Sequence, residues 1–409
     1  MKCWRAAVGA LVVAAVVVAG PVAAADTIRQ QQWHLEAMHA QEMWKATRGQ
    51  GITVAVIDGG FNLQHPDLAG QFLPGRDFSG SSGGVGSDPD GHGTGMAGLI
   101  AGTGKGLGGT GAQGLAPGVK LLPLKINNGT VESLVPSAFT GQLSAAITYA
   151  ADQGAEVVSI SQAMSEAVTS PEDVATLRSA VAAARAKGVL VVASVGNDAQ
   201  KGNPVEIPAA LPGVVGVGAA DRDGTATDES GYGPQVAFVA PGKDLIAACT
   251  APSGYCRSHG TSDATALVSA SAALVWSAHP EWTANQVLRV LIDTADGPKG
   301  GPARTDRLGY GSVRPWIALT APIDPGPADV PPLPIAQATP STTPSTTPSS
   351  TPSSAAATPS GMPKVDASRG SGGSVGLPIA AGAVVTALAV AAGVVFAVRR
   401  RRRGSTAAR

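Results

Sequence analysis

Cysteine is scarce in this sequence, whose 409 residues include only three. Cys3 lies in an N-terminal segment that we expect to be removed, which leaves Cys249 and Cys256. No other cysteine and no paired histidines stand near these two, so a metal site is disfavoured, and we predict no metal and no cofactor. A disulfide between them is the simplest expectation for an exported chain, and two free thiols are the alternative.

Charged residues are also few, at 14% of the chain, and the formal net charge is zero. The balance is uneven along the chain, because residues 26–321 hold 26 of the 29 acidic residues but only 19 of the 29 basic ones. A segment with a formal charge near −7 repels polyanions, so we expect no nucleic-acid partner.

The first 25 residues have the pattern of a secretory signal peptide. Lys2 and Arg5 precede an apolar run, and a group of small residues ends at Ala25, where we expect cleavage. An uncleaved N-terminal anchor is the alternative, although the apolar run is short for a membrane span.

Charge is absent from residues 376–398, a stretch long enough to cross a bilayer as one helix. Arginines follow it directly in the tail, 399–409, and cytoplasmic flanks are enriched in such residues. We therefore predict a single-pass protein of the cell membrane, with a cytoplasmic tail and the rest of the mature chain outside. A buried core helix is the alternative.

Aromatic residues make up only 4% of the chain and are absent from residues 322–375, which consist mainly of Pro, Ser, Thr, Ala and Gly. Such a segment cannot bury enough apolar surface to fold, so we predict a disordered linker. Residues 26–321 then remain as one large globular domain that begins with an N-terminal arm.

Within that domain, short β-branched runs alternate with Ala-rich stretches of helical period. This pattern indicates an α/β fold with a mainly parallel sheet and helices on both of its faces. The predicted strands are 53–57, 120–125, 156–161, 189–193 and 214–219. The predicted helices are 93–101, 137–153, 171–187, 262–278 and 283–294.

Three polar residues stand in glycine-bearing turns beside these elements. Asp58 follows the first predicted strand, His92 directly precedes the first predicted helix, and Ser262 is the first residue of the predicted helix 262–278. Taken singly, each has an ordinary explanation: Asp58 as a turn or cap former, His92 as a turn residue and Ser262 as an N-cap.

Together the three residues supply an acid, a base and a hydroxyl. Serine is a poor nucleophile at neutral pH unless a base takes its proton. We predict that His92 is that base, that Asp58 orients the imidazole and stabilises its cation, and that Ser262 attacks the substrate. The N-terminal end of a helix at Ser262 would also stabilise a developing oxyanion.

Five strings are similar, in order and spacing, to the signature stretches of the subtilisin family of serine proteases: VAVIDGG, DGHGTGMAG, GLAPGVKLLPLK, VVASVGN and GTSDATA. The resemblance covers about residues 50–295 and implies a subtilisin-like fold and an acyl-enzyme mechanism. It implies that the Asn197 side chain donates to the oxyanion, a turn asparagine being the alternative. It also implies that an extended peptide binds by strand addition beside the site. Two segments would line the primary specificity pocket: Ser161, Gln162 and Ala163, and Ser194, Val195 and Gly196.

Three positions depart from the residues usual in that family. Gly95 stands where a histidine is common, Ala163 where many relatives have glycine, and Asp263 where methionine usually follows the serine. None replaces a member of the predicted triad. The altered pocket leaves the cleavage preference open, and a carboxylate beside the nucleophile could slow attack or raise the working pH.

The N-terminal arm, proline-rich linker, membrane span and basic tail together resemble the mycosins, membrane-anchored subtilases that accompany type VII secretion systems. This resemblance implies a type VII secretion membrane complex as a partner. Two functions stay open: an active endopeptidase outside the membrane, or a proteolytically silent domain that caps or scaffolds a secretion complex. The Gly-rich residues 102–111 lack the ending of a phosphate loop and are predicted to form a surface loop.

Overall fold

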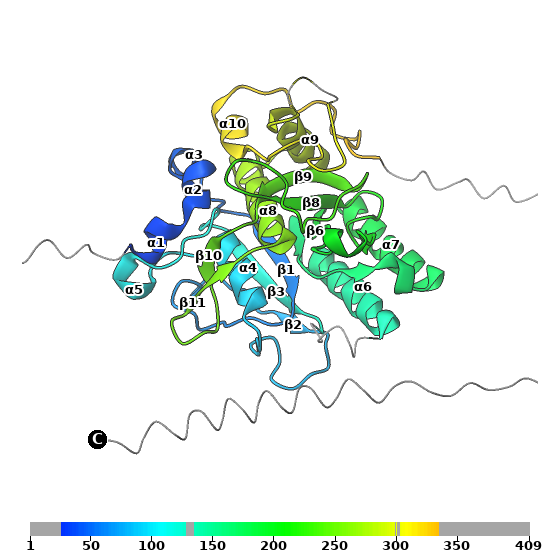
Figure 1. Cartoon of the computed structure of the whole chain (residues 1–409), viewed down its shortest axis with the longest axis horizontal. Coiled ribbons are helices and arrows are strands. Elements are labelled where there is room, and N and C mark those ends of the chain that lie inside the picture. Colours follow the sequence, from blue (N-terminus) through cyan, green and yellow to red (C-terminus); the bar gives the residue numbers. More distant parts are fainter. Residues whose placement is uncertain (1–25, 128–134, 299, 301–302, 335–409) are drawn as a thin grey trace, which may run out of the picture. The chain divides into compact units, whose positions relative to one another are not determined.

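A seven-stranded parallel sheet forms the centre of the computed structural model, which describes residues 26–127, 135–298, 300 and 303–334 (Figure 1). The strand order is β2-β3-β1-β4-β6-β8-β9, and each neighbouring pair is parallel. Parallel strands bring their carboxyl ends to one edge, where sites form in α/β folds. The strand bounds are β1 Thr53–Asp58, β2 Arg76–Asp77, β3 Lys120–Lys125, β4 Val157–Ile160, β6 Leu190–Ser194, β8 Val215–Ala220 and β9 Val236–Pro241.

The five predicted strands form the contiguous centre of this sheet, each within one residue of its expected bounds. The two edge strands were not predicted. β2 has only two residues, and the short apolar run of β9 cannot be told from a buried helix by periodicity alone.

Alternate residues of each strand face opposite sides of the sheet and build two cores. In β1, Val54 and Val56 pack into one core with α4, α8 and α9, whereas Ala55 and Ile57 pack into the other with α6 and α7 (Figure 1). Helices on both faces of a mainly parallel sheet confirm the predicted α/β architecture. The helix bounds are α4 His92–Ala101, α5 Gly106–Gly109, α6 Pro136–Asp152, α7 Pro171–Ala186, α8 Thr261–Ala278, α9 Ala284–Thr294 and α10 Pro315–Thr320.

Two small antiparallel pairs accompany the main sheet. β10 (Leu245–Ala248) pairs with β11 (Tyr255–Ser258) as a hairpin, and β5 (Met164–Ser165) pairs with β7 (Glu206–Ile207). Neither pair was predicted, because strands of two to four residues carry almost no periodic signal. Both pairs lie close in the chain to predicted site residues.

The N-terminal arm packs on the α4 side of the domain through three short helices, α1 (Ile28–Gln31), α2 (Trp33–Ala37) and α3 (Ala40–Ala46). The Gln32 side chain exchanges two hydrogen bonds with the backbone of Gln113, at 2.9 and 2.8 Å. The indole of Trp44 donates to the carbonyl of Leu115 at 2.8 Å. These specific polar contacts, beside the buried Met43, hold the arm on the domain.

At the other end, residues 322–334 lie along α9, although the sequence assigns them to the linker. The Arg289 guanidinium donates to the carbonyls of Pro325 and Pro327, and Leu333 packs against the core. The folded unit therefore continues at least to Pro334.

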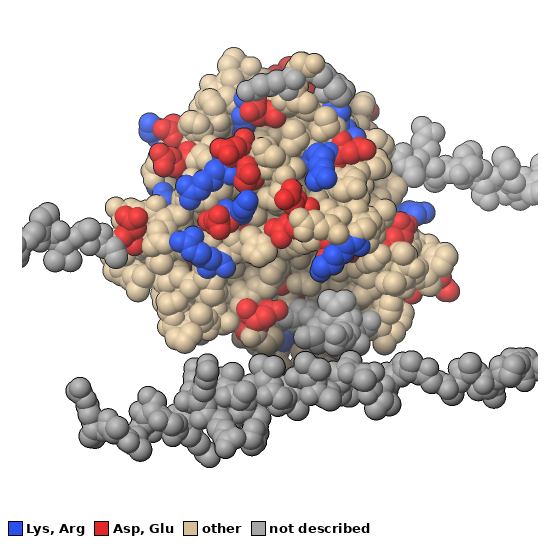
Figure 2. All heavy atoms as spheres, in the orientation of Figure 1, with Lys and Arg blue, Asp and Glu red and all other residues tan. Residues whose placement is uncertain are grey.

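The predicted signal peptide, the rest of the linker, the predicted span 376–398 and the tail 399–409 lie outside the described residues. Among the residues that are described, none of the helices is both long and apolar enough to cross a bilayer. On the face of the folded unit shown in Figure 2, acidic and basic side chains are interspersed.

Candidate active site

Asp58 and His92 form a hydrogen-bonded pair at the carboxyl edge of the sheet. Asp58 ends β1 and is fully buried, and its two carboxylate oxygens lie 2.9 and 3.0 Å from Nδ1 of His92. The same carboxylate accepts hydrogen bonds from the backbone N–H of Gly59 at 2.7 Å and from the side-chain amide of Gln162 at 3.0 Å. These contacts fix the carboxylate against the imidazole.

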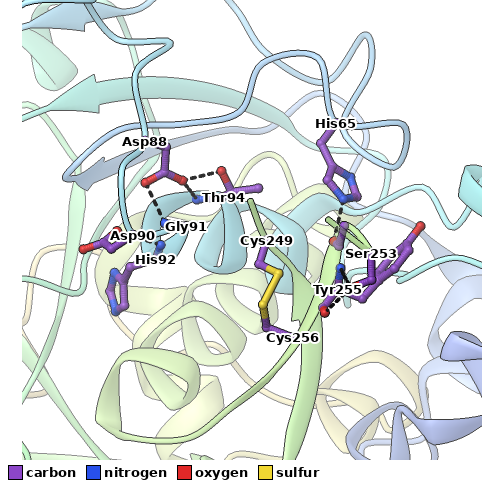
Figure 3. The surroundings of a disulfide bond; sticks show 11 residues. His65, Asp88, Asp90, Gly91, His92, Thr94, Cys249, Ser253, Tyr255 and Cys256 are labelled. Carbon is purple, nitrogen blue, oxygen red and sulfur yellow. Dashed lines mark hydrogen bonds between the residues drawn. A yellow bond between two sulfur atoms is a disulfide. The ribbon is translucent and has the colours of Figure 1, made fainter. Parts of the chain in front are cut away.

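The first turn of α4 holds His92 in place (Figure 3). The carboxylate of Asp88 accepts hydrogen bonds from the backbone N–H groups of Gly91 and Thr94 and from the Thr94 hydroxyl, while Asp90 accepts the His92 N–H at 3.0 Å. Gly91 has φ +78°, a conformation that glycine adopts without strain. The loop before α4 is thus shaped by its own acidic residues.

Gly93 lets the helix approach the end of β1. A Cβ atom at this position would lie 2.1 Å from the carbonyl oxygen of Gly60 and 3.0 Å from Cβ of Asp58. Because no side chain fits there, the glycine that follows His92 is required for the acid and the base to meet.

The charges around His92 favour its protonated form. Burial by itself lowers the pKa of the imidazole, but the attraction and hydrogen bond of Asp58, with smaller contributions from Asp263 and Asp90, outweigh it and raise the pKa to about 9. A general base with this pKa gains its free form only in alkaline solution.

Ser262 lies at the start of α8 with its side chain nearly buried. Its hydroxyl donates to the carbonyl of Ser161 at 3.3 Å, and the Ser161 hydroxyl donates back to the Ser262 carbonyl at 3.2 Å. No hydrogen bond joins Ser262 and His92 among the described residues, so the two groups must come closer before the hydroxyl proton can pass to the imidazole. Hydrogen bonds between catalytic groups are often loose without substrate.

Asn197 is fixed beside Ser262 by its neighbour Thr261. The amide oxygen of Asn197 accepts the Thr261 backbone N–H at 2.8 Å and the Thr261 hydroxyl at 3.0 Å. With its oxygen held in this way, the NH₂ group of Asn197 remains available as a donor, and it lies about 3.0 Å from where a Cβ of Gly260 would stand.

The predicted pocket segments follow two strands that are neighbours in the sheet. Residues 161–163 follow β4 and residues 194–196 end or follow β6, and β4 pairs with β6 in parallel register. The structure therefore brings both segments to the edge where Asp58 lies. The Gln162 side chain turns to Asp58, a contact that nothing in the sequence predicts.

Asp263 follows the serine and is fully buried. The Ser258 hydroxyl lies 2.6 and 2.8 Å from its two carboxylate oxygens. Burial raises the pKa of Asp263 to about 6, against the lowering effects of Ser258, His92 and His259. At neutral pH it therefore adds a negative charge on the nucleophile's side of His92.

Cys249 and Cys256 form a disulfide across the β10–β11 hairpin, with their Cα atoms 5.8 Å apart. The bond lies beside the loop that precedes α4 (Figure 3), where a Cβ on Gly91 would be 3.5 Å from Cβ of Cys249. The hairpin thus braces the loop before α4, called the histidine loop below, and it also leads directly to α8, the helix that carries Ser262. No group of three or more metal-ligating side chains is found in the part of the chain that the structure describes.

Residues 49–311 match the family model described as the subtilase family. The chain belongs to the subtilase family. This is a family of subtilisin-like serine proteases, as the sequence predicts. This subtilase is 30% identical to Mycosin-1 of Mycolicibacterium smegmatis over 342 residues, which cover 73% of this chain and 75% of that one.

Two solved structures are similar to this subtilase. One is the structure of the serine protease MycP1, an essential component of the type VII (ESX-1) secretion system, with a TM-score of 0.61 and 29% identity over 73% of this chain and 90% of that one. The other is the periplasmic assembly from the ESX-5 inner membrane complex, with a TM-score of 0.62 and 28% identity over 74% and 86% of the two chains.

Proposed function

We propose that this subtilase is an active serine endopeptidase that cleaves extended peptides through Asp58, His92 and Ser262. The observation that carries the proposal is the buried Asp58–His92 pair, at 2.9 Å, at the edge where the residue after β4, Ser161, is hydrogen-bonded to Ser262. A buried carboxylate on Nδ1 leaves Nε2 of the imidazole as the atom that takes and returns a proton.

The reaction then proceeds in two transfers. His92 takes the Ser262 proton as Oγ attacks the peptide carbonyl, and the resulting oxyanion accepts hydrogen bonds from the Asn197 NH₂ and the Ser262 backbone N–H. His92 returns the proton to the departing amine, which leaves an acyl group on Ser262. Water, deprotonated by His92, releases the acyl group and restores the enzyme.

The location of the enzyme is the second part of the proposal. We propose that the span 376–398 anchors the enzyme, that residues 26–334 lie outside the membrane, and that the enzyme works with a type VII secretion membrane complex. Two features support this: the sequence likeness to Mycosin-1, and the structural likeness to MycP1, a component of a type VII secretion system. Co-purification of a tagged full-length chain with secretion-complex proteins from membranes, lost when residues 376–409 are removed, is the expected result.

Covalent labelling of Ser262 tests the chemistry. The full-length chain is treated with a fluorophosphonate probe from neutral to alkaline pH, beside Ser262→Ala and Asp58→Asn. We expect labelling of the parent alone, rising with pH as His92 loses its proton, and loss of peptide turnover by about six orders of magnitude in Ser262→Ala. A parent that stays unlabelled at every pH supports the second function, a proteolytically silent scaffold. The observation that favours this alternative is that the Ser262 hydroxyl bonds to Ser161 and not to His92.

A further inference from the structure

A buried carboxylate outside the predicted triad lies where the two walls of the predicted specificity pocket meet. Glu206 begins β7, which pairs with β5, and β5 starts directly after Ala163 at the end of the first wall. The register sets Ser165 opposite Glu206. The backbone of Glu206 is thereby attached to the first wall of the pocket, residues 161–163. The second wall is formed by residues 194–196.

Its side chain packs on the second wall. Gly196 has φ +93°, and a Cβ atom there would lie 2.7 Å from Cγ and 3.5 Å from Cδ of Glu206. The stem of Glu206 therefore fills the space beside Gly196, one residue before Asn197. The Glu206 side chain therefore lies next to both pocket segments, close in the chain to Asn197.

This carboxylate has no compensating partner. Glu206 as a residue is only 9% exposed, and no hydrogen bond or ion pair reaches its side-chain oxygens among the described residues, but these oxygens are not among the fully buried atoms that lack a partner, so they are open to solvent. Partial burial makes the ionised carboxylate less favourable, and an incoming cation would offset that cost. Asp198, which pairs with the exposed Lys201 at 2.9 Å, acts on Glu206 with a further negative charge.

We propose that Glu206 is the specificity-determining residue of this enzyme and that it selects peptides with lysine or arginine immediately before the cleaved bond. The inference rests on the proposed function for the position of the pocket. An ammonium or guanidinium at the end of a long side chain would pair with the buried carboxylate, and Asp198 would add to the attraction. An apolar side chain of equal length would leave Glu206 unpaired.

The charge state of Glu206 adds a pH signature. Burial first, and Asp198 second, raise the pKa of Glu206 to about 7. The preference for a cationic residue over an apolar one should therefore grow as pH rises through this value. A cationic substrate favours the ionised carboxylate, so its binding lowers the pH at which the preference appears.

The experiment compares peptides that differ at one residue, with lysine, arginine, norleucine or leucine before the cleaved bond. For the full-length parent we expect kcat/KM for lysine and arginine to exceed that for norleucine by about ten- to hundredfold. Glu206→Gln, which keeps the shape, should lose most of that preference, because the rate for lysine and arginine should fall much more than the rate for norleucine. Glu166→Gln, which removes an exposed carboxylate across the same small sheet, is the matched control and should keep the preference.

Binding to Ser262→Ala separates this inference from the proposed function. The same peptides, carrying a fluorophore, are titrated against this variant and against the double variant with Glu206→Gln. Tighter binding of the lysine peptide only when Glu206 is present supports the pocket even if fluorophosphonate labelling fails. Equal binding of lysine and norleucine peptides, or equal rates in an enzyme that labels normally, overturns the inference and leaves the proposed protease activity standing.

Discussion

The phenol of Tyr255 donates a hydrogen bond of 2.7 Å to the carboxylate of Asp67, although 188 positions separate the two residues. Asp67 is fully buried and also accepts the backbone N–H groups of Gly106 and Ala112, at 2.6 and 3.0 Å. One carboxylate therefore ties the Gly-rich residues 102–111 to the disulfide hairpin that braces the histidine loop.

Asp67→Ala should be strongly destabilising, because two backbone N–H groups and one phenol lose a charged acceptor in a buried place. We expect a loss of about 3 to 5 kcal/mol in the free energy of unfolding. Tyr255→Phe removes one of the three bonds and should cost only about 1 to 2 kcal/mol. Urea denaturation in a Ser262→Ala background, which avoids self-digestion, measures both, and an Asp67→Ala loss no larger than that of Tyr255→Phe would contradict this account.

Two neighbouring glycines of α4 should respond in opposite ways to alanine. Gly93→Ala places a Cβ against Gly60 and Asp58, so it should cost at least about 2 kcal/mol and separate Asp58 from His92, with a large fall in kcat. Gly95→Ala meets its nearest atom at an acceptable 3.4 Å and gains helix propensity, so stability should hold or rise by up to about 1 kcal/mol. Thermal unfolding and turnover of the two variants test the contrast, and equal behaviour would refute it.

Asp263 should set the pH at which the enzyme works. Its carboxylate helps to raise the pKa of His92 to about 9, so the parent should reach full activity only in alkaline solution. Asp263→Asn keeps the shape, removes the charge and should move the acidic limb of the kcat/KM profile to lower pH. Asp90→Asn removes a carboxylate with a smaller influence on His92 and should move the limb less. An unshifted limb in Asp263→Asn would show that the charge beside the serine does not reach the base.

His34 should make the N-terminal arm sensitive to acid. It is fully buried in α2, neither ring nitrogen has a hydrogen-bond partner among the residues that the structure describes, and burial, with a smaller effect of Arg29, lowers its pKa to about 3. In the unfolded chain His34 binds a proton once the pH falls below its ordinary pKa of 6.5. In the folded chain it binds the proton only when the pH falls to about 3. The stability that His34 contributes is therefore complete above 6.5 and is lost as pH falls through this window, by up to about 1.4 kcal/mol per pH unit.

His34→Leu removes this dependence without loss of a hydrogen bond. The difference in unfolding free energy between His34→Leu and the parent should be small and constant above neutral pH and should grow in favour of the variant as the solution is acidified. The raised pKa values of Asp88 and Asp263 make the parent more stable as the pH falls, which opposes the effect of His34. The difference between variant and parent, and not the parent's stability alone, is therefore the quantity to measure. A difference that does not change with pH would disprove the assignment.

Short-range patterns were enough for the central strands, for the helices on both faces and for the turns that carry Asp58, His92 and Ser262. Each of these depends on the residues within a few positions, since strand and helix periods and glycine turns are local properties. The family resemblance rests on the same local strings, and the structure brings Asp58 and His92 together as those strings lead one to expect.

Tertiary structure alone decided which distant groups meet. The partners of Asp67, the turn of Gln162 to Asp58, the hydroxyl of Ser258 on Asp263 and the packing of Glu206 on Gly196 each join chain segments through space, and no local pattern specifies such neighbours. The electrostatics follow the same division, because a pKa depends on burial and on nearby charges that exist only once the chain has folded. The sequence by itself thus determined the kind of fold and the chemical groups available, whereas folding decided how those groups are oriented and charged.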